Sequence, residues 1–261
     1  FMDYQTITYE LNAAGYAVIG LNRPDKMNAM TAQMRAEIPA AVRAALTEGA
    51  RAIVLTGHGG AFCSGQDLGD GGNAAHIDLE RVLRDEYNPM VKTLVDAPVP
   101  VISAVNGAAA GAGANLALAA DVVIASESAY FLQAFSRIGL IPDAGGTYFL
   151  PRLIGGAKAM GAALFAEKIS AKEAERIGLI WEYVADESFE SHWRARAQAL
   201  AAGPTEAYKR IKTTLRASLD NGLEDQLNLE AQEQGRAGKS RDFKEGVLAF
   251  LEKRKARFEG R

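Results

Sequence analysis

A single carboxylate, Asp143, stands out in the segment Phe135–Thr147, because it lies between a proline and two glycines and is the only charged residue from Gly139 to Thr147. A second unusual segment, residues 100–121, begins as a β-branched run, breaks into Ala and Gly, and then turns helical. Small side chains leave backbone N–H groups open to a ligand. An acid on one loop and bare amides on another could move a proton next to a carbonyl group and stabilise the resulting oxyanion.

The residues around Asp143 also allow a purely structural role. An aspartate that follows a proline and precedes glycines often caps the next helix, which is expected to begin near Ala144. From the residues alone, a helix cap and a catalytic acid are equally good interpretations of Asp143.

Several other chemistries are disfavoured by the motifs. The pair Gly111 and Gly113 follows a predicted strand, but Leu116 occupies the place of the third glycine of a dinucleotide-binding fingerprint. The chain has neither a P-loop ending nor a Gly-x-Ser-x-Gly elbow. Cys63 is interpreted as a small buried residue, and no metal site is expected from three scattered histidines, His58, His76 and His192.

The composition indicates a globular protein with a large core. The 261 residues are 48% hydrophobic and carry a formal charge of −3, which argues against nucleic-acid and membrane-surface partners. Residues 99–120 are apolar over a membrane-spanning length, but their Ala, Gly and Asn content fits a buried strand, turn and helix better. One cysteine suits a reducing compartment, so a cytoplasmic location is expected.

The hydrophobic pattern predicts an α/β core followed by helices. The predicted strands are a hairpin over 4–11 and 16–21 and single strands over 51–57, 99–105 and 121–125, while residues 57–72 read as a long loop. The predicted helices cover 31–47, 78–95, a segment around Asn115, 144–154, 156–166 and a segment from Ser170. Only amphipathic helices are predicted after Ser188, so the expected organisation is a core over 1–200 and a helical region over 201–261.

Four ordered motifs resemble the crotonase, or enoyl-CoA hydratase/isomerase, superfamily over essentially the whole chain. They are Leu21-Asn-Arg-Pro24, Ala61-Phe-Cys-Ser-Gly-Gln-Asp67, Pro100-Val-Ile-Ser-Ala-Val-Asn-Gly107 and Gly139-Leu-Ile-Pro-Asp-Ala-Gly-Gly-Thr147. The resemblance implies an α/β spiral of ββα repeats and a C-terminal helical region that builds homotrimers or hexamers made of two trimers.

The resemblance also implies roles for individual residues. Backbone N–H groups of Gln66 and Ala112 are expected to form an oxyanion hole, and Asp143 falls where isomerases of the family place a single catalytic acid. The two glutamates of the hydratases align with Asn115 and Phe135, which are assigned to the acyl pocket. Because neither residue can transfer a proton at neutral pH, ordinary hydration is not expected.

Coenzyme A is expected as part of the substrate, and no separate cofactor is implied. Its phosphates would lie along two loops that carry the predicted coenzyme A-binding residues Arg23, Lys26, Ser64, Gln66, Asp67 and Leu68.

Within the superfamily, the segments Tyr87–Val91, Phe135–Asp143 and Asp242–Leu251 resemble the branch that isomerises ring-1,2-epoxyphenylacetyl-CoA to its oxepin form in phenylacetate degradation. The alternatives are an isomerase that moves a β,γ double bond of a linear enoyl-CoA to the α,β position, and a catalytically silent scaffold that binds acyl-CoA.

Overall fold

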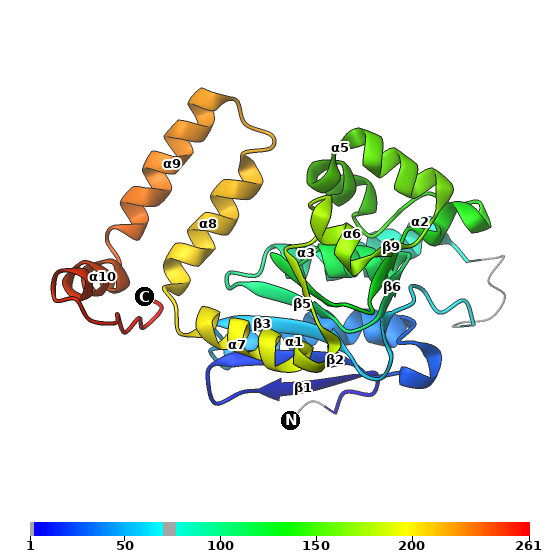
Figure 1. Ribbon diagram of the computed structural model, residues 1–261, viewed down its shortest axis with the longest axis horizontal. Coiled ribbons are helices and arrows are strands. Elements are labelled where there is room, and N and C mark those ends of the chain that lie inside the picture. The colour runs from blue at the N-terminus through cyan, green and yellow to red at the C-terminus, as the bar shows by residue number, and fades with distance from the viewer. Residues whose placement is uncertain (1–2, 70–76) are drawn as a thin grey trace.

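The computed structural model describes residues 3–69 and 77–261 of the chain and shows an α/β core with a helical extension (Figure 1). The end of the predicted loop over 57–72 and His76 lie outside the described residues. No helix in the described ranges is long and apolar enough to cross a membrane.

The larger sheet has six strands in the order β1-β2-β3-β5-β7-β10, with β1 antiparallel to β2 and the other neighbours parallel. These strands are Ile7–Leu11, Tyr16–Leu21, Ala52–Gly57, Val101–Val105, Val122–Ser126 and Glu182–Val184. The first five of these strands correspond to the five strands predicted from the sequence. β10 was not predicted, because three residues are too few for an alternating pattern to show.

A smaller sheet, in the order β4-β6-β8-β9, was also missed by the sequence analysis. Its strands have two or three residues each: Ala61–Cys63, Ala108–Ala110, Tyr130–Leu132 and Ile169–Ser170. Segments this short contain too few residues for a strand pattern to show in the sequence, so their β-structure depends on tertiary pairing.

The pairs β3–β4, β5–β6 and β7–β8 each send their first strand to the large sheet and their second to the small one, and a helix follows each pair. This is the predicted ββα repeat.

The helices of the core cover the sheets as the amphipathic patterns predict. They are α1 (Ala32–Thr47), α2 (Leu79–Val82), α3 (Asn88–Val95), α4 (Ala112–Leu118), α5 (Gly146–Phe165), α6 (Ala171–Arg176) and α7 (Phe189–Ala201). A π-helical turn, Leu83–Tyr87, joins α2 to α3, and short 3₁₀ turns lie at Pro24–Lys26, Ala134–Ile138 and Asp186–Ser188. The two predicted helices over 144–166 form α5, which is broken at Gly155 by a left-handed φ of 73°.

Both faces of the large sheet are buried. Val18, Val54 and Ile102 point to one side and pack with Phe189 and Trp193 of α7. The intervening strand residues face the main core, which contains α1, α3 and α4. Burial on two faces explains why these strands read as continuous apolar runs.

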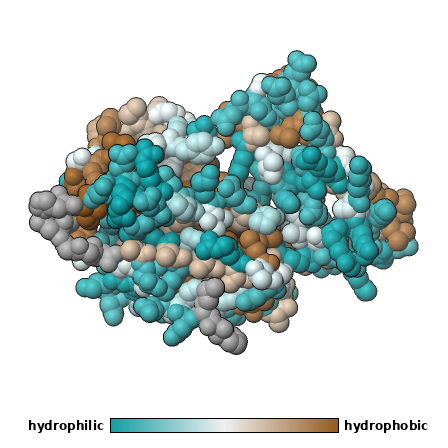
Figure 2. Space-filling model, turned by 180° about the vertical axis from the view of Figure 1, so that it is seen from behind, coloured by the Kyte–Doolittle hydropathy of each residue, from teal (hydrophilic) through white to brown (hydrophobic). Residues whose placement is uncertain are grey.

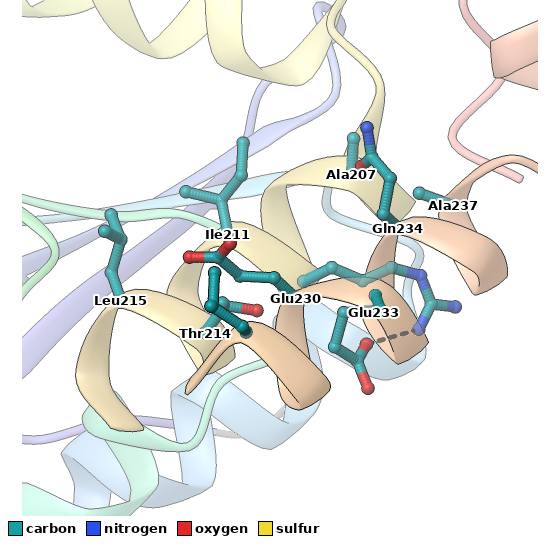
Figure 3. A pocket seen from close by; sticks show the side chains of 11 residues that line it. Ala207, Ile211, Thr214, Leu215, Glu230, Glu233, Gln234 and Ala237 are labelled. Carbon is teal, nitrogen blue, oxygen red and sulfur yellow. Dashed lines mark hydrogen bonds and ion pairs between the residues drawn. The ribbon is translucent and has the colours of Figure 1, made fainter. Parts of the chain in front are cut away.

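Three helices extend from the core and are called here the helical arm: α8 (Thr205–Ala217), α9 (Leu223–Ala237) and α10 (Arg241–Leu251). A groove of about 720 Å³ runs between α8 and α9, lined by Ile211, Leu215 and Leu227 among others (Figure 3). Large apolar side chains also gather at the far end of the arm (Figure 2), where Phe250 is 83% and Leu251 is 71% exposed.

A carboxylate of the core is one of the groups that attach the arm. Asp121, just before β7, lies 2.7 Å from Lys212 Nζ and 2.8 Å from an Arg216 guanidinium nitrogen, both on α8. It also accepts a hydrogen bond of 2.8 Å from the Val101 N–H at the start of β5. Asp121 therefore holds α8 against the edge where two central strands begin.

We expect Asp121→Asn to lower the free energy of unfolding by about 3 kcal/mol, because it leaves two largely buried cations without their counter-charge. Urea denaturation at fixed protein concentration measures the change, and Glu190→Gln, which breaks an exposed i,i+4 pair, is the control with an expected effect under about 0.5 kcal/mol. Equal stability of the two variants would contradict the role of Asp121.

Candidate active site

The acid predicted from the sequence lies in a tight turn at the start of α5. Ala144 (φ 48°) and Gly145 (φ 88°) are both left-handed, and the Gly146 N–H donates a hydrogen bond of 2.8 Å to the Asp143 carbonyl. These are the features of a type I′ turn. A left-handed alanine is uncommon and costs conformational energy, which the packing around the turn must offset.

The two glycines are required by close packing. A Cβ atom on Gly145 would lie 2.5 Å from the Phe149 ring, and one on Gly146 would lie 2.4 Å from the side-chain nitrogen of Asn115. The second contact shows that the turn lies directly against α4. The small residues that marked this segment in the sequence thus allow two elements to meet.

The side chain of Asn115, on α4, holds the Asp143 turn in place. Its Nδ2 donates to the Asp143 carbonyl at 2.8 Å, and its Oδ1 accepts from Gln133 Nε2 at the same distance. The side chain is completely buried, so its amide is engaged with protein atoms on both sides. Asn115 therefore positions the turn that bears Asp143. Its assignment to the acyl pocket remains a prediction.

The Asp143 carboxyl group has no such partner at one of its two oxygens. Its Oδ1 is shielded from solvent and receives no hydrogen bond within the described structure. Burial raises the pKa of Asp143 to about 6. The helix-cap interpretation fails, because Gly145 is the N-cap of α5 and no side chain caps that helix. A carboxyl group with this pKa can accept and return a proton near neutral pH.

The first predicted oxyanion donor, Gln66, lies in an extended segment beside Met30. The Met30 N–H donates to the Gly65 carbonyl at 2.8 Å, and the Asp67 N–H donates to the Met30 carbonyl at 3.0 Å. In this parallel bridge, the N–H of the intervening Gln66 faces away from Met30 and has no backbone acceptor in the described structure.

The second predicted donor, Ala112, is the first residue of α4. The N–H groups of a first helical turn have no acceptor within the helix, so the Ala112 N–H is free to bind a ligand. The preceding Gly111 adopts φ 53° and ψ −130°, a conformation open mainly to glycine. A Cβ atom on Gly65 would lie 3.6 Å from the Ala112 nitrogen. The two predicted donors therefore belong to loops that touch.

Phe135, the other position where hydratases carry a glutamate, is 6% exposed in the 3₁₀ turn Ala134–Ile138. A Cβ atom on Gly111 would lie 3.9 Å from the tip of its ring. The residue therefore supplies an apolar wall beside the second donor where a glutamate would supply a proton.

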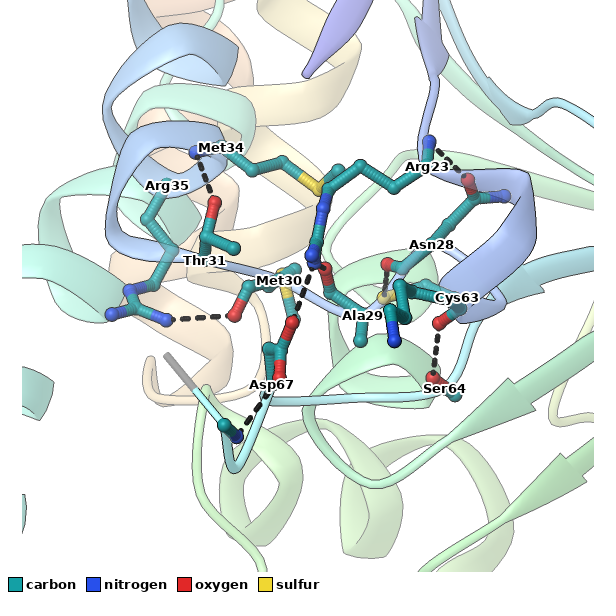
Figure 4. Close-up of polar contacts among 12 residues, drawn as sticks. Arg23, Asn28, Ala29, Met30, Thr31, Met34, Arg35, Cys63, Ser64 and Asp67 are labelled. Carbon is teal, nitrogen blue, oxygen red and sulfur yellow. Dashed lines mark hydrogen bonds and ion pairs between the residues drawn. The ribbon is translucent and has the colours of Figure 1, made fainter. Parts of the chain in front are cut away.

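The two loops predicted to bind coenzyme A meet in space. Arg23 forms an ion pair of 2.8 Å with Asp67, and Ser64 Oγ lies 3.5 Å from the Lys26 carbonyl (Figure 4). The hydrogen bond from Arg23 holds the pKa of Asp67 below its ordinary value. Lys26 and Leu68 are exposed. Arg23 thus has a structural partner, which leaves Lys26 as the more available cation for a phosphate.

Arg35 is a positioning residue that the sequence analysis missed. It is 5% exposed on α1, bonds Glu86 through two nitrogens and donates to the Met30 carbonyl at 3.0 Å. It therefore supports the strand against which Gln66 is oriented. In the sequence, Arg35 is visible only as a cation next to the apolar stripe of α1. A cation at such a position is expected to face solvent, and its burial becomes apparent only from the packing of α3 against α1.

The described residues contain no group of three or more His, Cys, Asp or Glu side chains arranged to hold a metal ion. His58 bonds Thr8, and His192 bonds Glu182. The thiol of Cys63 is fully buried, and burial raises its pKa to about 12, so it remains protonated.

Comparison with known proteins places this geometry in a family. The family described as enoyl-CoA hydratase/isomerase matches residues 12–261. A Rhodobacter capsulatus protein named "Probable enoyl-CoA hydratase" is 62% identical over 260 residues, which is 100% of both chains. The 1,2-epoxyphenylacetyl-CoA isomerase of Escherichia coli is 43% identical over 251 residues, covering 95% of this chain and 96% of that one. The crystal structure of enoyl-CoA hydratase from Bacillus anthracis superposes with a TM-score of 0.91 at 31% identity, over 98% of this chain and 100% of that one.

We expect Asp143→Asn to stabilise the protein above pH 6. The folded-state pKa of about 6 exceeds the ordinary value of 3.8, so the buried carboxylate costs about 3 kcal/mol once both states are ionised and nothing when both are protonated. The gain in unfolding free energy should therefore be near zero below pH 4, grow as the pH rises to 6, and then stay constant. Urea denaturation across this range measures it; a variant less stable than the parent at pH 8 would contradict the burial argument.

Proposed function

Because the chain belongs to the enoyl-CoA hydratase/isomerase family, we propose that it is an isomerase of acyl-CoA thioesters in which Asp143 moves a proton and the Gln66 and Ala112 amides bind the thioester oxygen. The observation that carries this proposal is the partly buried carboxyl group of Asp143, whose Oδ1 is shielded from solvent and has no hydrogen-bond partner in the described structure. It is set in a turn that is anchored to the helix bearing Ala112.

An isomerase is favoured over a hydratase by the number of acids. Addition of water needs one group to activate the water and another to deliver a proton, whereas an isomerase can use one group for removal and return. The two positions where hydratases carry glutamates hold a buried amide, Asn115, and a buried ring, Phe135. Neither can exchange a proton at neutral pH.

The proposed reaction begins when the Asp143 carboxylate removes a proton from the carbon next to the thioester carbonyl. The electron pair moves into the carbonyl, and the two amide N–H groups stabilise the enolate oxygen that forms. The protonated Asp143 then returns the proton to another carbon of the same acyl group. Composition is unchanged, and the enzyme regains its starting state.

Ring-1,2-epoxyphenylacetyl-CoA is our proposed substrate. Its conversion to the oxepin removes a proton from the side-chain carbon next to the thioester, breaks the carbon–carbon bond shared by the epoxide and the six-membered ring, and adds a proton to a ring carbon. The proposal is supported by the E. coli relative at 43% identity, which bears the name of this activity.

A linear β,γ-enoyl thioester is the second candidate substrate, since it needs the same single acid. The Streptococcus mutans relative named trans-2-decenoyl-[acyl-carrier-protein] isomerase, at 34% identity over 264 residues, supports it. A non-catalytic scaffold that only binds acyl-CoA would not need a carboxyl group with a raised pKa at position 143.

We also propose that the protein self-associates through the helical arm into a trimer, or a hexamer of two trimers, and acts in the cytoplasm. Large apolar side chains of the arm are from 44% to 83% exposed, among them Leu223, Leu227, Val247, Phe250 and Leu251. Exposed apolar surface on this scale is typical of an interface.

We expect Asp143→Asn to reduce isomerisation by at least ~100-fold while acyl-CoA affinity is retained, because the amide keeps the size of the side chain but cannot shuttle a proton. Turnover of the ring epoxide thioester and of a linear β,γ-enoyl thioester should be measured side by side, with Asp225→Asn on exposed α9 as the matched control. Full activity in Asp143→Asn would exclude Asp143 as the catalytic acid. The faster of the two substrates in the parent enzyme identifies the acyl group.

The pH profile should report the same carboxyl group. Because Asp143 must be ionised to accept the first proton, kcat/KM is expected to rise with pH through about 6 and level off above it. A rate that is already maximal at pH 4.5 would show that the active carboxyl group has an ordinary pKa.

The oligomer should be visible as mass in solution. We expect three or six times the chain mass of 27.8 kDa by analytical ultracentrifugation at micromolar concentration. The double variant Phe250→Glu/Leu251→Glu should shift the distribution to smaller species, whereas Leu11→Glu on the edge strand β1 should not. A monomeric parent protein would overturn the interface.

A further inference from the structure

Tyr87 carries a buried hydroxyl group that the reaction described above does not use. The residue ends the π-helical turn Leu83–Tyr87 and is 1% exposed, and its Oη is shielded from solvent without a hydrogen-bond partner in the described structure. An unsatisfied buried hydroxyl is costly in a folded protein and calls for an explanation. Single π-helical turns occur frequently at functional sites.

The Tyr87 ring is fixed next to the candidate active site. The guanidinium of Arg35 lies 4.8 Å from the ring centre, and the same guanidinium donates to the Met30 carbonyl that also receives the Asp67 N–H. Tyr87 is thus joined through one buried cation to the segment that orients the first oxyanion donor.

The electrostatic neighbours of the Tyr87 hydroxyl belong to the same site. Burial raises the pKa of Tyr87 well above its ordinary value, the adjacent Arg35 guanidinium partly offsets this by lowering the pKa, and the nearby Asp143 carboxylate raises it. The hydroxyl is therefore a hydrogen-bond donor at every physiological pH. Its Oη and the Asp143 Oδ1 are both shielded from solvent and do not bond each other.

We propose that the Tyr87 hydroxyl donates a hydrogen bond to an oxygen atom carried by the acyl group, and so makes the site selective for oxygenated acyl-CoA thioesters over hydrocarbon ones. This inference rests on the proposed function for the location of the acyl group. A ring epoxide and an oxepin each carry one oxygen beyond the thioester, whereas a linear enoyl group carries none. A site with a buried donor discriminates against a ligand that leaves the donor unpaired.

Binding of two stable ligands tests the proposal without turnover. Isothermal titration should compare 2-hydroxyphenylacetyl-CoA with phenylacetyl-CoA, because the phenolic oxygen stands on the ring carbon that the epoxide would occupy. We expect the wild-type protein to bind the hydroxylated ligand at least ~10-fold more tightly. In Tyr87→Phe this preference should disappear, whereas Tyr183→Phe on β10, the control, should keep it.

The Tyr87→Phe protein is expected to fold, because the substitution retains the ring that stacks under Arg35 and removes only an unpaired hydroxyl group. Its melting temperature should equal or exceed that of the parent. The inference is overturned if the parent binds the two ligands equally, if it binds neither, or if Tyr87→Phe keeps the preference.

Failure of this inference can be told apart from failure of the proposed function. A parent protein that prefers the hydroxylated ligand but does not isomerise the ring epoxide would retain the role of Tyr87 and lose the proposed reaction. A parent protein that isomerises the epoxide while Tyr87→Phe keeps the preference would do the reverse.

Discussion

The hydrogen bond from Asn115 to the Asp143 carbonyl is the contact on which the geometry of the candidate site depends. Asn115 lies one helical turn after Ala112, so one short helix carries both a proposed oxyanion donor and the anchor of the acid-bearing turn. The close approach that this bond needs is possible because Gly146 has no side chain. The acid and the amide donor are thereby fixed relative to each other by a rigid element.

The same contact bears on the proposal that this chain does not use the two-acid chemistry of the hydratases. A glutamate at position 115 would have no N–H to offer to the Asp143 carbonyl, so a second acid there would remove the donor that holds the turn. Asn115 cannot transfer a proton, but its amide fixes the position of the remaining acid, Asp143. The unpaired carboxyl group of Asp143 then sits in surroundings that raise its pKa toward neutrality, where one group can both take and return a proton.

Around the site, buried cations hold backbone carbonyl groups in place. Arg35 holds the Met30 carbonyl, and Lys212 holds the carbonyls of Ala97 and Val99 just before β5. Each cation has its own carboxylate, Glu86 or Asp121, so the charge is compensated where it is buried. The helical arm is thus tied to the strand that leads into the Ala112 loop.

The sequence by itself determined the features that depend on local pattern. The first five strands of the large sheet and the helices were predictable because their side chains alternate, form apolar runs or recur at helical spacing. Asp143 was visible because a lone charge between Pro and Gly is unusual. The family motifs then indicated which backbone amides are expected to form an oxyanion hole.

Only the tertiary structure decided the features that depend on contact between distant segments. The small sheet forms because segments of two or three residues find partners across the fold, and segments this short show no strand pattern in the sequence. The exclusion of a helix-cap role for Asp143 required knowing that Gly145 is the N-cap of α5, and the shielded Oδ1 of Asp143 could be recognised only in the fold. Asn115 as an anchor, Arg35 as a support and Tyr87 as an unpaired donor were hidden for the same reason, since burial and hydrogen-bond partners are properties of the folded chain.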